Sequence, residues 1–184
     1  MSPADRTARA AHMADARKKY QEWVARGAPG RLRLRETPGT NICEAVYPAG
    51  WAGIRFRLLS LCSVLGAFSL GQAWRRFWYR LAGVRMGANV YISYGVKLDV
   101  LAPWMITLGD GCTLGVEAIV AMHMFHQDSL VLRKIHLGQG AVVGARALVF
   151  ASLGDHAILG PGSALFTDAS PGETLLGVPA TRIF

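Results

Sequence analysis

The C-terminal half of this 184-residue chain repeats an aliphatic residue every six positions. The period matches neither the 3.6-residue turn of a helix nor the two-residue alternation of a strand. It predicts a coil with three flat faces, in which each aliphatic side chain points inward. Each six-residue repeat (hexad) forms one face, so three hexads make one coil. The twelve hexads therefore predict an all-β parallel β-helix of about four coils. The twelve positions are Met86, Ile92, Leu98, Leu108, Leu114, Val120, Leu137, Val143, Val149, Leu153, Leu159 and Leu165.

Glycine follows seven of these twelve aliphatic residues. Because glycine tolerates backbone conformations that other residues avoid, we expect these glycines to form the turns between faces. Small residues stand three positions after the glycine position and are expected to fill the corners of the coil. Cys112 is one of them, which indicates a packing role rather than a nucleophile.

Five stretches of the repeat share one pattern: MGANVYI, ITLGDGCTLG, LGQGAVVGARALV, LGDHAILGPGSAL and the ending PGETLLGVPATRI. They resemble the hexapeptide-repeat acyltransferase family, in particular maltose, galactoside and polysaccharide O-acetyltransferases. The resemblance covers residues 84–184. It implies a left-handed coil, a homotrimer, and acetyl-CoA or another acyl-CoA as co-substrate in a groove between neighbouring coils. The implied reaction is acyl transfer to a hydroxyl of a saccharide or lipid-linked saccharide.

The hexad phase is lost after Val120 and resumes at Leu137, which predicts an extruded loop over roughly residues 124–136. In the family a histidine at the base of a loop in this position serves as general base, so the resemblance assigns this role to His123. Imidazole, with an ordinary pKa of about 6.5, can accept the acceptor's proton at neutral pH. His126 lies within the loop and is expected either to contact substrate or to be an ordinary surface histidine.

Two further residues are candidates for the acceptor site. Asp99 resembles the family's earlier carboxylate near the acceptor, although a simple turn cap is an equal alternative. Trp104 lies in the other interruption, between Leu98 and Leu108, and is expected to wall the acceptor pocket.

The expected cofactor site consists of small residues that match turns lining the CoA arm in the family. The family often carries a Thr-Lys pair before the aspartate of its last coil, but here Phe166 and Thr167 precede Asp168. Arg182 or Arg146 would have to replace the missing lysine. The residues assigned to the cofactor are Gly144, Ala145, Gly162, Ser163, Ala164 and Arg182.

Residues 1–50 are expected to form an N-terminal helix and a connector, and they resemble no family. Ser2 is a candidate helix cap, and Tyr20, Trp23 and Val24 share one face at helical spacing. Gly27 and Gly30 end the predicted helix, which spans residues 2–27. Residues 28–50 are expected to be irregular.

Residues 51–83 form an apolar and basic helical segment, with 17 uncharged residues from Leu58 to Trp74 between flanking arginines. Three alternatives remain: a helix that packs on protein, a helix in the membrane interface, or a marginal span. The basic flanks and the aromatic residues favour the interface over a span, since a span needs about 20 mostly apolar residues. The aromatic residues are Trp51, Trp74, Trp78 and Tyr79.

Charge and cysteine content limit the possible partners and the cellular compartment of the protein. Residues 1–85 carry 15 Lys and Arg against 5 Asp and Glu, whereas residues 86–184 carry 5 against 7. The repeat region therefore lacks the basic surface of a nucleic-acid-binding protein. Three unpaired cysteines and no signal peptide indicate a cytoplasmic protein, either free or peripheral at the inner membrane face.

Two alternatives to an acyltransferase remain. One is a non-catalytic trimeric β-helix that acts as a scaffold. The other is a zinc-dependent enzyme resembling the carbonic anhydrases of the same architecture, which bind metal through three histidines. The second is weak because no histidine lies between Met86 and Val120, so no metal is expected.

Overall fold

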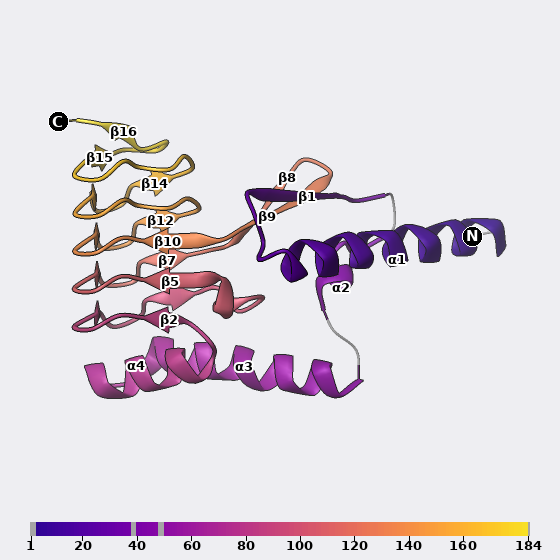
Figure 1. Cartoon of the computed structure of the whole chain (residues 1–184), viewed down its shortest axis with the longest axis horizontal. Coiled ribbons are helices and arrows are strands. Elements are labelled where there is room, and N and C mark those ends of the chain that lie inside the picture. The colour runs from indigo at the N-terminus through magenta and orange to yellow at the C-terminus, as the bar shows by residue number, and fades with distance from the viewer. Residues whose placement is uncertain (1–2, 38–39, 48–49, 184) are drawn as a thin grey trace. The chain divides into compact units, whose positions relative to one another are not determined.

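A computed structural model describes residues 3–37, 40–47 and 50–183. The chain divides into two compact units, which we describe separately (Figure 1). The first unit comprises Met1–Phe56 and His123–Arg133, and the second comprises Arg57–Met122 and Lys134–Phe184. The helices are α1 (Pro3–Ala25), α2 (Cys43–Val46), α3 (Gly50–Phe68), α4 (Gln72–Leu81) and the short 3-10 helix η1 (Pro103–Met105).

Helix α1 confirms the predicted N-terminal helix. Ala16, Tyr20 and Trp23 recur at helical spacing and are buried together in the first unit. Gly27 adopts a φ of 82°, which ends the helix. The Trp23 Nε1 donates a hydrogen bond to the Pro29 carbonyl at 2.9 Å and fixes the chain where it leaves the helix. Ser2, the expected cap, lies outside the described residues.

The connector after α1 is not irregular, so this expectation is wrong. It contains β1 (Arg31–Arg35), which pairs antiparallel with β9 (Ser129–Arg133) in register Arg31 to Arg133. The extruded loop is a hairpin in which β9 pairs with β8 (His123–His126). We call this three-stranded sheet, in the order β1-β9-β8, the hairpin sheet. The Arg-Leu-Arg-Leu-Arg sequence forms a strand because it places Leu32 and Leu34 on one face.

The second unit stacks short parallel strands into three sheets, as the hexads predict. The orders are β10-β5-β2, β16-β15-β13-β11-β6-β3 and β14-β12-β7-β4, with only the terminal β15–β16 pair antiparallel among the described strands of these sheets. Their bounds are β2 (Arg85–Met86), β3 (Tyr91–Ile92), β4 (Lys97–Leu98), β5 (Ile106–Leu108), β6 (Thr113–Leu114), β7 (Ile119–Val120), β10 (Ile135–Leu137), β11 (Val142–Val143), β12 (Leu148–Val149), β13 (Ile158–Leu159), β14 (Ala164–Leu165), β15 (Thr174–Leu176) and β16 (Thr181–Arg182).

The hexad aliphatics form the core of this stack. Ile92, Leu114, Val143 and Leu159 occupy matching positions of neighbouring strands and are at most 1% exposed. All twelve positions are buried except Met86, which is half-buried in the first strand. The prediction that these side chains point inward is therefore confirmed.

Glycine is required after the aliphatic residues for a different reason from the one expected. Neither Gly115 nor Gly144 adopts the left-handed conformation that turns require. A Cβ on Gly115 would lie 2.5 Å from the Ala145 nitrogen, and one on Gly144 would lie 2.4 Å from the Pro161 nitrogen. Glycine is needed because the next coil's backbone approaches too closely for any side chain. Left-handed glycines stand elsewhere in the turns, for example at Gly111 and Gly140.

Helix α4 covers the open edge of the first coil at the β2 end of the stack (Figure 1). Its Gln72 side chain hydrogen-bonds both the backbone nitrogen and the carbonyl of Ile92, at 3.0 and 2.7 Å. Arg75 Nη1 donates to the same carbonyl at 2.6 Å, and the Tyr79 hydroxyl donates to the Val96 carbonyl. These side chains satisfy backbone groups that would otherwise form an unpaired strand edge. None of the helices in the described part of the chain combines the length and the hydropathy of a membrane span.

Candidate active site

One corner of the coil differs from the other two. Where the first and second corners carry glycine at seven of eight positions, the residues after Leu98, Val120, Val149 and Leu165 are not glycine. The backbone nitrogens of Asp99, Ala121 and Phe150 each donate to the carbonyl just before the next residue of the column, at 2.9 to 3.0 Å. We call it the third corner, and it consists of Asp99, Ala121, Phe150 and Phe166.

Asp99 acts as a turn cap within the third corner. The carboxylate is 6% exposed and accepts hydrogen bonds from the Leu101 nitrogen at 2.7 Å and the Met122 nitrogen at 2.9 Å. A buried carboxylate with two backbone donors holds both segments firmly. Because Met122 directly precedes His123, Asp99 fixes the chain at the point where it leaves the coil.

His123 is the first residue of β8 in the hairpin sheet and is half-buried. Its cross-strand partner is Leu132, which pairs in turn with Leu32. The imidazole meets the Phe125 ring edge-on, with ring centroids 6.5 Å apart. The histidine therefore lies on the apolar face of the hairpin sheet, at the root of the predicted loop.

His126 lies on the opposite face of the same strand. It pairs with Ser129, which pairs in turn with Arg35, and it is exposed. Side chains three positions apart on a strand point to opposite sides, so His123 and His126 cannot converge on one ion within this sheet. The described residues hold no group of three His, Cys, Asp or Glu side chains arranged for a metal.

Phe150 and Phe166 form a stacked pair that the sequence analysis missed. Their ring centroids lie 5.5 Å apart with planes 9° from parallel, and Phe166 is 38% exposed. The pair extends the column that begins at Asp99 and offers a flat apolar surface. The available signal was the absence of glycine from this one corner.

The residues assigned to the cofactor divide by exposure. Ala145 and Gly162 are exposed and adjacent, since the Gly162 nitrogen donates to the Ala145 carbonyl at 2.9 Å. A Cβ on Gly162 would meet no atom within 4 Å, so the space beside it is open. Gly144 is half-buried beneath the next coil, whereas Ser163 and Ala164 are buried, at 2% and 1% exposure.

The two candidate substitutes for the missing lysine both form ion pairs. Arg182 lies 3.9 Å from the Glu173 carboxylate, and its side chain is 67% exposed. Arg146 donates from Nε to Glu117 Oε2 at 2.7 Å, which raises the pKa of the guanidinium. The Arg182 ion pair has the longer distance of the two. Trp104 lies on η1 beside Gly83, whose added Cβ would be 3.3 Å from the Trp104 Cβ.

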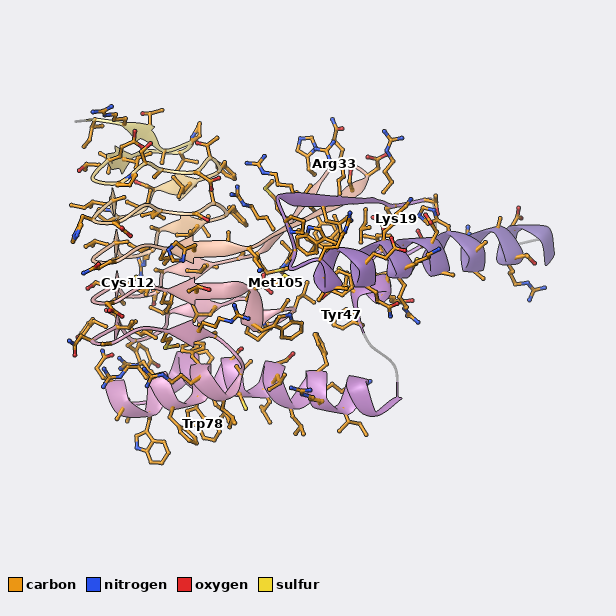
Figure 2. The ribbon with its side chains drawn as sticks, viewed as in Figure 1. Lys19, Arg33, Tyr47, Trp78, Met105 and Cys112 are labelled. Carbon is orange, nitrogen blue, oxygen red and sulfur yellow. The ribbon has the colours of Figure 1, made fainter. Side chains whose placement is uncertain are left out.

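A cavity of about 330 Å³ lies in the first unit, between α1 and β1. It was not predicted from the sequence. Figure 2 shows Lys19 and Arg33, which contribute to its wall from the two elements. Lys19 Nζ lies 2.6 Å from the Asp15 carboxylate, so this cation of the cavity wall already forms an ion pair. The lining residues are His12, Asp15, Ala16, Lys19, Arg33, Leu34 and Arg35.

Sequence comparison finds relatives for part of the chain, whereas no family model matches it. The chain is 31% identical over 84 residues to WcaF of Escherichia coli (strain K12), which is named as an acetyltransferase of colanic acid biosynthesis. It is 26% identical over 87 residues to the delta-poly-L-ornithine synthetase of Acinetobacter baumannii. Each match covers 46% of this chain, but only 40% and 6% of those proteins. The chain thus spans less than half the length of these curated relatives.

Solved structures share the fold over most of their length. A hexapeptide-repeat acetyltransferase of Vibrio cholerae, solved with acetyl coenzyme A, superposes with a TM-score of 0.62, covering 74% of this chain and 90% of that chain at 17% identity. A maltose O-acetyltransferase of Clostridium difficile superposes with a TM-score of 0.54, covering 71% and 87% at 14% identity. At such identities the likeness establishes the fold alone. The resemblance to hexapeptide-repeat acetyltransferases is therefore confirmed, in sequence over part of the chain and in fold over most of it.

Proposed function

We propose that the chain is a cytoplasmic acetyl-CoA-dependent O-acetyltransferase that acts on a saccharide or lipid-linked saccharide, with His123 as general base. The observation that carries the proposal is a histidine placed where the chain leaves a hexapeptide-repeat stack, directly after an amide held by a buried carboxylate. The names of the relatives support acetyl transfer, and the Vibrio cholerae structure supports acetyl-CoA as donor. A left-handed winding, about four coils and a homotrimer belong to the same proposal.

The proposed chemistry needs one proton acceptor. The neutral imidazole of His123 takes the proton of the acceptor hydroxyl as its oxygen attacks the thioester carbonyl carbon. A carbon–oxygen bond forms, the carbon–sulfur bond breaks, and the imidazolium returns the proton to the departing thiolate. No covalent enzyme intermediate is required when donor and acceptor are held together.

Asp99 is proposed as a positioning residue for this base. Its carboxylate holds the Met122 amide, and so limits the conformations open to the next residue in the chain. A general base works only within hydrogen-bonding reach of the proton that it removes, so a shift of the strand start would lower the rate. Trp104 and His126 remain proposed contacts of the acceptor.

The donor is proposed to lie along the exposed turns of the second unit. The open space beside Gly162 and the small Ala145 side chain would let a narrow pantetheine arm approach the backbone. Arg182 is exposed and is proposed to pair with a phosphate of the nucleotide. Gly144, Ser163 and Ala164 shape these turns from beneath.

Calorimetry with acetyl-CoA, combined with a thiol-release assay over a panel of saccharides, tests the proposal. We expect wild type and His123→Ala to bind acetyl-CoA alike, while turnover with the acceptor falls by about a hundredfold or more in the variant, since general-base catalysis contributes about that much. His126→Ala is the matched control and should keep most of the activity. If wild-type protein that is folded and oligomeric fails to bind acetyl-CoA, the proposal is wrong and the scaffold alternative gains support.

A further inference from the structure

The two helices before the coils expose a large number of apolar side chains. Each is between 39% and 80% exposed, which is unusual for so many large apolar residues in one short segment. We call this set the α3–α4 apolar surface, and it consists of Leu58, Leu61, Leu65 and Phe68 on α3, Leu70 between the helices, and Trp74, Phe77 and Leu81 on α4.

These residues form continuous stripes rather than scattered positions. Leu58, Leu61, Leu65 and Phe68 recur at three- and four-residue intervals, as do Trp74, Phe77 and Leu81, so each helix presents one apolar side. Figure 2 shows Trp78, which lies beside this stripe, on the side of α4 away from the coils. The Phe77 and Trp78 rings pack edge-on, with centroids 5.1 Å apart.

The opposite sides of the helices are mixed: Ala67 and Tyr79 are buried there, and polar side chains bond to backbone groups. Arg75 is 8% exposed, with its Nε on the Ser69 carbonyl and Nη1 on the Ile92 carbonyl. Ser60 donates to the Val100 carbonyl at 2.8 Å, and the Ala67 carbonyl accepts from the Gly95 nitrogen at 3.0 Å. These bonds fix which side faces outward, so the apolar surface cannot be buried by rotating the helices.

This arrangement departs from the ordinary design of a solenoid cap. A terminal cap turns its apolar side to the stack and a polar side to water. Here the side toward the coil is mixed and the large apolar side chains face outward, so we expect a partner outside the described residues to cover the surface.

The charge around the surface identifies what covers it. No Asp or Glu occurs between Glu44 and Asp99, a stretch that holds six arginines and one lysine. Arg57 and Arg80 are exposed on the same two helices. A second copy docked face to face would bring two sets of arginines together, which is unfavourable. An anionic lipid surface complements both the arginines and the apolar stripe, and Trp74 and Trp78 are side chains typical of the lipid–water boundary.

We infer that the α3–α4 apolar surface docks the protein on an anionic lipid bilayer, with both helices lying in the interface. This goes beyond the proposed function and does not depend on it. If the proposed function also holds, docking would restrict the enzyme to acceptors presented at the membrane. The number of exposed apolar residues indicates partial insertion by both helices rather than attraction by charge alone.

Vesicle flotation with the full-length protein tests the inference. Phosphatidylcholine vesicles with about one third phosphatidylglycerol should carry wild-type protein to the top of the gradient, and pure phosphatidylcholine vesicles should carry little. Phe77→Ser combined with Leu81→Ser should lower partitioning about tenfold or more, because two large apolar side chains no longer leave water. Leu176→Ser changes a similarly exposed apolar residue in β15, so it is the matched control and should float like wild type.

A charge variant separates the two contributions. Arg57→Gln and Arg80→Gln should each reduce binding about fivefold at low salt, and the loss should shrink as salt screens the membrane. Arg182→Gln is the control, because this arginine lies on β16. Circular dichroism and sedimentation velocity verify that each variant keeps its fold and oligomeric state.

Two outcomes would overturn the inference. Wild-type protein that stays in the aqueous fraction with anionic vesicles would show that lipid does not cover the surface. An apolar double variant that floats normally but sediments as a smaller oligomer would show that another copy of the chain covers it. Neither outcome bears on acetyl transfer, which is measured without vesicles on a soluble saccharide.

Discussion

At the residue scale, position within a repeat determines the chemistry open to a side chain. Asp99 and the glycines of the other corners occupy equivalent hexad positions, yet Asp99 caps two backbone amides where glycine permits close approach. His123 was predicted from the break in the hexads together with the family resemblance, which assigns a histidine at this position to the general base. Phe150 and Phe166 were missed because a single hexad does not show that one corner lacks glycine throughout, and only the strand register aligns them.

Asp99→Asn tests the positioning role. The amide has one oxygen where the carboxylate has two, so one of the two backbone donors loses its acceptor. We expect kcat to fall about tenfold or more, while the affinity for acetyl-CoA measured by calorimetry stays unchanged. Asp155→Asn is the control, since this carboxylate also accepts from a backbone nitrogen, that of Gln139 at 2.8 Å, but at another corner. Equal losses of kcat in both variants would contradict a specific role for Asp99.

Cys112 provides a second residue-scale prediction. Burial raises the pKa of its thiol from an ordinary value of 9.0 to about 12. The folded protein therefore keeps this thiol protonated at pH 9, where an unfolded chain would be half ionised. We expect iodoacetamide at this pH to modify the half-buried Cys43 and Cys62 but to spare Cys112 until denaturant is added. Peptide mass spectrometry measures each site, and rapid labelling of Cys112 in folded protein would contradict its buried placement.

At the element scale, the sequence periodicity predicted the strands of the hexad repeat but not the hairpin sheet, whose strands are distant in the sequence. Each hexad strand is readable because its neighbours repeat the same pattern. The hairpin sheet is not, because Arg31 pairs with Arg133, more than a hundred residues away. The alternation of Arg and Leu in residues 31–35 is typical of a strand. Nothing near Arg31 in the sequence shows which strand it pairs with.

Gly115→Ala tests the close stacking of coils. The added methyl would lie 2.5 Å from the Ala145 nitrogen, so the backbone of one coil must move. We expect the free energy of unfolding to fall by about 1–3 kcal/mol, as for other overpacked interiors. Ser93→Ala, at the same corner one coil earlier, already carries a Cβ and should change stability by less than about 0.5 kcal/mol. Chemical denaturation measures both, and two equal values would refute the stacking explanation.

At the scale of the whole molecule, the chain combines a stack that its sequence specifies almost residue by residue with a unit built from separate segments. The stack could be predicted because burial, period and register all follow from one repeat. The first unit could not, since residues 1–56 join a hairpin that the stack itself extrudes. The α3–α4 apolar surface was visible in the sequence as an apolar run, but only the structure shows which side of the helices faces the coil.

The ladder of Ile92, Leu114, Val143 and Leu159 is regular in space, yet the chain travels 22, 29 and then 16 residues between successive rungs. Inserted residues leave the coil and return to it at the corners. The stacked aliphatic residues therefore keep their positions whatever the length of the insertion. A stack of this kind can therefore gain new parts by lengthening an excursion while its interior stays untouched. The hairpin that carries His123 is one such excursion. A designer could replace this hairpin, or add another excursion at a neighbouring corner, without changing the buried stack.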